Sequence, residues 1–303
     1  MAKYTLICFI ATLLFVSCKK EPETTAQPRP APEQAVQATL SSSGKGTANF
    51  IAAFIEKKKQ VKNKLGSLSR DEANALYETY KQENDSSLVV LDGYERNILE
   101  NYYSYFSDER GNAINPPDSI TKKVKLLDSA GLEYWEIGEG IVEIRTQPNY
   151  YLNLFKGSVS PDYEDYITLL AKDDENLYAA DAGLAISFAD VGRRVINWEK
   201  FIAKHPYSKM TPNAIEIYKI YQEGFLLGMD NTPTIEVTDN KIYPENLKEF
   251  KAFSAANPKS PTTALIKVVI ETPGTKDQIS AAVIKEQDKL INKLIADTTP
   301  DYY

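Results

Sequence analysis

The chain has 303 residues, of which 43% are hydrophobic and 25% are charged, with 35 basic and 42 acidic side chains. This balance is typical of a globular protein of one or two domains and is too polar for a protein built mainly of membrane-spanning helices. The net charge of −7 excludes nucleic acid as a partner, because nucleic-acid binding relies on clustered lysine and arginine. One histidine and two cysteines are too few for a His-rich zinc site or an evident Cys-His catalytic pair.

The first 18 residues have the pattern of a secretion signal. Lys3 precedes an apolar run from Leu6 to Val16, which is too short to span a bilayer. A serine and then Cys18 follow this run, and a small residue directly before a cysteine resembles the lipobox of bacterial lipoproteins. The resemblance implies that residues 1–17 are removed and that Cys18 carries the lipid. The alternative is ordinary signal cleavage that leaves a chance cysteine.

Residues 18–47 are expected to form a lipidated, disordered tether. Their only apolar residues larger than alanine are Val36 and Leu40, so the segment cannot bury enough surface to fold. Cys18 is followed by Lys19 rather than by the aspartate that retains some lipoproteins in the inner membrane. We therefore expect the protein in the bacterial cell envelope, anchored to a membrane by lipid, with the outer membrane favoured over the inner.

Residues 48–303 predict a mainly α-helical body that forms one domain, with a candidate sub-boundary near 112–119. Apolar residues recur at helical spacing over 50–68, and the next helix starts with a capping box formed by Ser69 and Glu72. The fold class that we expect is an irregular array of helical hairpins with one or two small β-hairpins.

Two segments of the body have the composition of β-hairpins. Residues 133–137 and 141–144 are rich in β-prone side chains and flank Gly138-Glu139-Gly140, so they predict a hairpin with a glycine-bearing loop. A second hairpin is expected near residues 234–243.

A long amphipathic helix is expected from Leu177 to Ile202, because apolar residues alternate in steps of four and three. Asp181 lies on the apolar stripe of this predicted helix. We therefore expect its carboxylate to be buried and paired with Arg193, Arg194 or a lysine, because an unpaired buried charge is costly. The alternative interpretation of Asp181 is a catalytic or ligand-binding acid.

The last third of the chain contains a weak internal repeat. The pattern Trp-x-x-Phe followed by Pro-x-Ser at residues 198–208 returns as Phe-x-x-Phe followed by Pro-x-Ser at residues 250–260. Each copy predicts an aromatic helix, a turn and a second helix, which resembles the helix-turn-helix of tetratricopeptide arrays. His205 precedes the first turn, and we interpret it as a surface turn residue rather than a metal ligand.

Four further motifs stand out in the body. They are Trp135-x-Ile137-Gly138-Glu139-Gly140, Asp181-Ala182-x-x-x-Ile186-Ser187-Phe188, Arg194-Val195-Ile196-x-Trp198-Glu199-x-Phe201 and Gly228-Met229-Asp230-Asn231-Thr232-Pro233. These motifs are similar to those of a group of bacterial exported proteins and lipoproteins, over about residues 70–300. The resemblance implies export and a helical body, but it brings no activity and no site residues.

Candidate chemistry is limited to carboxylates. The sequence contains no phosphate-binding loop, Rossmann glycine motif or His-Glu-x-x-His motif, and we predict no cofactor and no metal site. Two acids suffice for glycoside hydrolysis, so the candidates for ligand binding or acid-base chemistry are Glu139, Asp181 and Asp230. We assign none of them as catalytic.

The function that we expect is a lipid-anchored, non-catalytic binding or scaffold module for a protein, a peptide or a glycan. One alternative is a carboxylate-dependent glycan-cleaving enzyme. Another is an inhibitor or immunity-type lipoprotein that acts against an envelope hydrolase. The expected membrane partner is contacted through the lipid on Cys18.

Overall fold

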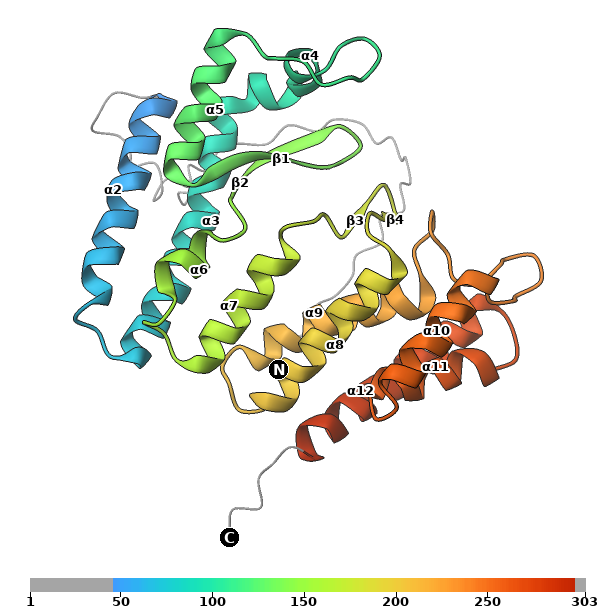
Figure 1. The fold of residues 1–303 in the computed structure, drawn as a ribbon. Coiled ribbons are helices and arrows are strands. Elements are labelled where there is room, and N and C mark those ends of the chain that lie inside the picture. Colours follow the sequence, from blue (N-terminus) through green and yellow to red (C-terminus); the bar gives the residue numbers. More distant parts are fainter. Residues whose placement is uncertain (1–45, 298–303) are drawn as a thin grey trace, which may run out of the picture. The chain divides into compact units, whose positions relative to one another are not determined.

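The computed structural model describes residues 46–297. Within that range the chain forms eleven helices and two antiparallel two-stranded sheets (Figure 1), which confirms the expected mainly α-helical fold with small β-hairpins. The expected signal segment, Cys18 and nearly all of the expected tether lie outside the described residues. Over the described part of the chain, no helix has both the length and the apolar character needed to cross a membrane.

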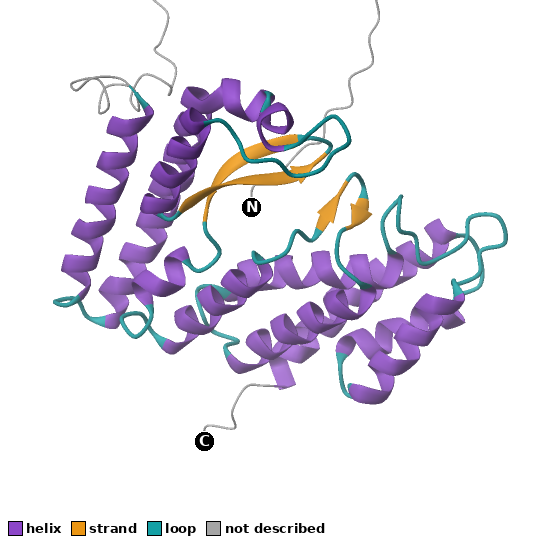
Figure 2. Cartoon of the chain, turned by 45° about the horizontal axis from the view of Figure 1, so that its top comes forward, coloured by secondary structure: helices purple, strands orange, loops and turns teal. Residues whose placement is uncertain are grey.

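The described elements are helices interrupted by two short hairpins. In chain order they are α2 (Thr47–Leu65), α3 (Arg70–Glu100), α4 (Tyr102–Phe106), α5 (Asp118–Ala130), β1 (Leu132–Gly138), β2 (Ile141–Thr146), α6 (Tyr150–Phe155), α7 (Pro161–Asp173), β3 (Ala179–Ala180), β4 (Gly183–Leu184), α8 (Phe188–Lys204), α9 (Thr211–Leu227), α10 (Pro244–Ala256), α11 (Pro261–Glu271) and α12 (Lys276–Asp297). Figure 2 shows the four strands as two separate hairpins that are joined to helices at their ends.

The N-terminal elements form where the sequence predicts them. The Ser69 hydroxyl accepts a hydrogen bond from the backbone N–H of Glu72, and the Glu72 carboxylate accepts one from the N–H of Ser69, which confirms the capping box. The helix α5 is capped by Gly131, and β1 then pairs with β2 around residues 138–140, which confirms the expected hairpin. This hairpin packs against α3.

A buried carboxylate ties these N-terminal elements together. Glu95 of α3 is 1% exposed and accepts a hydrogen bond from the hydroxyl of Thr47, in the first turn of α2. It also accepts hydrogen bonds from Lys123 of α5 at 2.5 Å and from Tyr134 of β1 at 3.2 Å. Four elements therefore meet at one side chain, and α2 begins one residue before the expected start of the body.

The internal repeat is visible as two turns of the same geometry, one between α8 and α9 and the other between α10 and α11. The N–H of Ser208 donates to the C=O of His205, and the N–H of Ser260 donates to the C=O of Asn257, both at 3.1 Å. A threonine three positions after each serine donates its hydroxyl to the same carbonyl. The φ angles of His205 and Asn257 are −129° and −131°. The repeated residues therefore produce the same local fold twice.

A buried polar network joins α9, α11 and α12 in the C-terminal half of the described chain. The side-chain amide of Gln222 donates to the hydroxyl of Tyr218 at 2.9 Å and to that of Thr262 at 2.7 Å. Its carbonyl oxygen accepts a hydrogen bond from Gln287 of α12 at 2.9 Å. Because these buried groups satisfy one another, the network stabilises one arrangement of α9, α11 and α12.

The expected helix from Leu177 to Ile202 is wrong over residues 177–187, because α8 starts only at Phe188. Ser187 caps α8 by accepting a hydrogen bond from a backbone N–H in its first turn, at 3.1 Å. Residues 179–184 form the hairpin β3–β4 instead, and its tight turn places Asp181 at a φ of 52°. The Asp181 side chain is exposed, so the expected burial of its carboxylate is also wrong.

The segment expected to form a second hairpin, residues 234–243, does fold back on itself in antiparallel pairing, but it forms no regular strands. Ile235 and Ile242 form a single β-bridge, and the N–H of Tyr243 donates to the C=O of Thr234 at 3.0 Å. The second regular hairpin of the described residues is β3–β4, at a place where the sequence predicted helix.

Candidate functional site

The three candidate acids lie on loops whose backbones meet. A Cβ added to Gly138, the residue before Glu139, would lie 2.8 Å from the Cβ of Ala180 and 3.4 Å from the backbone nitrogen of Asp181. Only glycine allows the β1–β2 loop to approach the β3–β4 hairpin so closely. The hairpin is also held by Asn231, whose side-chain amide donates to the backbone C=O of Asp181.

The carboxylates themselves do not form an enclosed site. Glu139, Asp181 and Asp230 are all exposed, and none of them lines the three cavities that lie along α8. Thr232, in the same loop as Asp230, accepts a hydrogen bond from the N–H of Leu184 at 2.9 Å. Backbone, amide and hydroxyl groups thus hold these loops together, and three of the four sequence motifs contribute residues to this contact.

A groove runs along one side of α8, which lies between α7 and α10 (Figure 1). Three adjoining cavities of about 400, 400 and 230 Å³ form this groove, and Asn197 lines all of them. The helix α7 contributes Lys172 to the first two cavities and Leu169 to the third. The helix α10 forms the opposite wall of the first cavity with Glu249 and Phe253.

The α8 residues of the groove recur every four positions, mostly as adjacent pairs, which places them on one face of the helix. In the first and third cavities they are Ala189, Gly192, Arg193, Ile196, Asn197, Lys200, Phe201 and Lys204. At 1.5 Å per residue, the stretch from Ala189 to Lys204 is about 22 Å long. A groove of this length can hold about seven residues of an extended chain.

The second cavity of the groove lies over a buried ion pair. Arg194 is 8% exposed, its Nε lies 3.5 Å from Oδ1 of Asp173, and its guanidinium donates to the backbone C=O of both Asp173 and Asn176 at 2.8 Å. Trp198 donates its indole N–H to the second carboxylate oxygen of Asp173 at 2.7 Å. Burial raises the pKa of Asp173 despite these partners. Arg194, an expected partner of Asp181, therefore joins α8 to the end of α7 instead.

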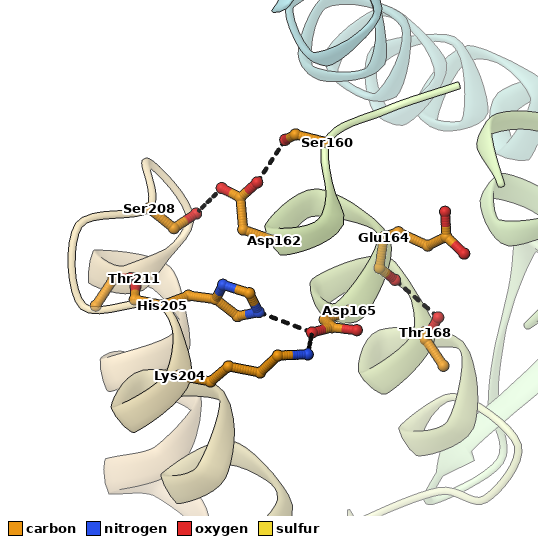
Figure 3. Close-up of polar contacts among 9 residues, drawn as sticks. All are labelled: Ser160, Asp162, Glu164, Asp165, Thr168, Lys204, His205, Ser208 and Thr211. Carbon is orange, nitrogen blue, oxygen red and sulfur yellow. Dashed lines mark hydrogen bonds and ion pairs between the residues drawn. The ribbon is translucent and has the colours of Figure 1, made fainter. Parts of the chain in front are cut away.

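Beside the third cavity, polar contacts join α7 to the end of α8 and to the turn that follows it (Figure 3). Asp165 accepts a hydrogen bond from Lys204 at 2.6 Å and lies 2.7 Å from Nε2 of His205. Burial acts to raise the pKa of Asp165, but the hydrogen bonds from Lys204 and His205 outweigh it and lower this pKa. Ser208 donates its hydroxyl to Asp162 at 2.5 Å, so it is not paired with the imidazole as a serine nucleophile would be.

His205 is thus a structural turn residue. Asp165 is its hydrogen-bonding partner across the two helices, and the ring of Phe201 lies 5.1 Å from its own. Over residues 46–297, no group of three or more histidine, cysteine, aspartate or glutamate side chains is placed to hold a metal ion.

The groove was not predicted from the sequence, although the α8 residues that line it follow a recognisable pattern. Arg193, Asn197, Lys200 and Lys204 follow one another at helical spacing, on the side of α8 away from the fully buried Trp198. Such a polar stripe is typical of a helix face that contacts only water. The packing of α7 and α10 on either side turns this stripe into the floor of a groove.

No protein-family model matches the chain, and neither does any curated protein or solved structure. A fold of packed helices is compatible with many functions. The chemistry of the groove is therefore the guide to the function of this chain.

Proposed function

We propose that this chain is a lipid-anchored protein of the bacterial cell envelope whose helical body is a non-catalytic binding module. The anchor is supported by the sequence, in which Ser17 and Cys18 directly follow an apolar run of signal-peptide length. The observation that carries the binding function is the groove along α8, where three adjoining cavities share Asn197. Cavities of about this size, with a few polar groups converging on them, are typical of ligand sites.

The positions of the acids favour binding over glycan cleavage. Glycoside hydrolysis requires two carboxyl groups that face each other across the substrate, about 5 to 9.5 Å apart. Glu139, Asp181 and Asp230 lie on exposed loops outside the groove. Inside it, Asp165, Asp173 and Asp190 already have cationic partners, and the remaining acids of its described residues, Glu249 and Glu175, line different cavities. A body that holds its ligand without changing it is the function that this arrangement supports best, and an inhibitor of an envelope hydrolase would be one form of it.

Photo-crosslinking tests the groove as a binding site. Ala189→p-benzoylphenylalanine places a photoreactive side chain at an exposed position in the first cavity, and the full-length chain is irradiated in the envelope of its host. The control, Ala252→p-benzoylphenylalanine, carries the same group at an exposed position of α10 that does not line the groove. We expect a discrete adduct, identified by mass spectrometry, from the groove position alone. Identical adducts at both positions, or none at Ala189, would contradict the proposal.

A further inference from the structure

Three acids of the groove are already engaged by cations. Asp173 forms the buried pair with Arg194, and Asp190 pairs with Arg193 one turn along α8. Asp165 is paired with Lys204 and lies beside His205. These acids therefore offer little negative charge to a ligand.

The other charges of the groove are distributed unequally. Lys172 and Lys200 both line the first cavity, and neither forms an ion pair with any described residue. Among the described residues that line this cavity, the one acid is Glu249, which belongs to α10 on the opposite wall. Glu175 lines only the second cavity. Arg193 is 70% exposed in its pair, and such exposed pairs are weak enough to exchange for a ligand. The first cavity is thus a positive site in a chain whose net charge is −7.

The uncharged groups of the groove fit a peptide backbone. The half-buried carboxamide of Asn197 makes no hydrogen bond to another residue of the described range. It offers one acceptor and two donors, which match the N–H and C=O groups of an extended chain. The aromatic residues of the first cavity, Phe225 and Phe253, are 1% and 8% exposed, so these two rings present no open face on which a sugar could stack.

Resting on the proposed binding function of the groove, we infer that its ligand is an extended acidic peptide segment of about seven residues. Its carboxylates contact Lys172 and Lys200, and its main chain bonds to Asn197. Peptide recognition of this kind combines main-chain hydrogen bonds, which give affinity, with side-chain contacts, which give specificity.

The test measures fluorescence anisotropy of labelled peptide pools with the full-length chain in detergent. Every second residue is aspartate or glutamate in the acidic pool and lysine or arginine in the basic pool, and the other residues vary. Oligogalacturonate, a glycan rich in carboxylates, is a third probe. Lys172→Glu combined with Lys200→Glu reverses the charge of the groove. The matched control, Lys248→Glu combined with Lys251→Glu, makes the same change at exposed positions of α10 that do not line it.

We expect the acidic pool to bind and the basic pool not to bind. The affinity should fall at least about tenfold in the groove double variant and less than about twofold in the control, and it should weaken as salt is raised. Absence of binding by the acidic pool, equal binding of both pools, or equal behaviour of the two double variants would overturn the acidic assignment. Tighter binding of oligogalacturonate than of the acidic peptides would overturn the peptide assignment.

A blocking variant separates this inference from the proposed function. Asn197→Trp fills the point that the three cavities share, and circular dichroism verifies that the variant is folded. One outcome is that Asn197→Trp abolishes the binding of a probe that the groove double variant still binds as tightly as the wild type. In that case the groove is a binding site, and only the acidic ligand is refuted. If Asn197→Trp leaves the binding of every probe unchanged, the proposed function fails as well.

Discussion

At Gly228, the residue after α9, one added methyl group should destabilise the fold. Its φ of 69° and ψ of −163° lie in a backbone region that only glycine adopts readily. A Cβ at this position would lie 2.3 Å from the carbonyl oxygen of Thr232 and 2.8 Å from the backbone nitrogen of Thr234. Both are backbone atoms, so the loop would have to open and lose the hydrogen bond from the N–H of Met229 to the C=O of Thr232, now 3.1 Å long.

The structure sets the expected size of this effect. Backbone strain of this kind costs about 1–3 kcal/mol, and a lost hydrogen bond adds about 1 kcal/mol. We therefore expect Gly228→Ala to lower the free energy of unfolding by about 3 kcal/mol, which corresponds to a fall in Tm of about 6–12 °C in a domain of this size. Gly93→Ala is the matched control, because Gly93 lies inside α3 and an added Cβ meets no atom within 4 Å. This change should raise stability by about 0.5–1 kcal/mol.

Urea denaturation and thermal melts followed by circular dichroism measure both variants. The two substitutions add the same methyl group. Opposite changes in the free energy of unfolding would therefore result from the different backbone geometry at the two positions. If Gly228→Ala is as stable as the wild type, or if both variants shift in the same direction, our reasoning about this loop is refuted.

Asp181→Asn should change the free energy of unfolding by less than about 0.5 kcal/mol, because the side chain is exposed and asparagine tolerates a positive φ. A loss of several kcal/mol on denaturation would instead indicate a buried, paired carboxylate. Burial raises the pKa of Glu199, although hydrogen bonds from Ser260 and Tyr218 act to lower it. A folded-state pKa above the unfolded value of about 4.3 means that stability is lost as the pH rises from that value through the folded-state pKa. Glu199→Gln should therefore flatten the profile of stability against pH over this range, and parallel profiles for variant and wild type would contradict the explanation. Cys18→Ala should abolish the incorporation of labelled fatty acid and release or misprocess the protein, whereas equal labelling of the two chains would exclude the lipid anchor.

Features that are decided within a few residues could be predicted from the sequence. The capping box at Ser69, the hairpin around residues 138–140 and the two Pro-x-Ser turns all form as expected, because each depends on hydrogen bonds between close neighbours in the chain. Asp181 was placed on a helix because Leu177 and Leu184 happen to fit the helical period. Its true position depends on Ser187, which starts α8 later, and on a contact from Asn231, which is 50 residues away.

In the candidate site, too, some features could be predicted from the sequence and others depend on distant contacts. The three acids were proposed as a group, and their loops do meet, but through the close approach of Gly138 and hydrogen bonds of Asn231 and Thr232 rather than through the carboxylates. The sequence gives no sign that the carboxylates themselves point to solvent, since exposure is set by the elements that pack around each loop.

The sequence by itself determined the helical class, the apolar face of most helices and the polar stripe of α8. Periodicity specifies these features because it reports which side of a helix avoids water. Only the tertiary structure decided that α7 and α10 flank α8, that Arg194 pairs with Asp173, and that Asn197 lies at the centre of a groove. The hydrophobic stripe of a helix must pack against another element, but it does not specify which one. The groove therefore forms only when distant parts of the chain have packed together.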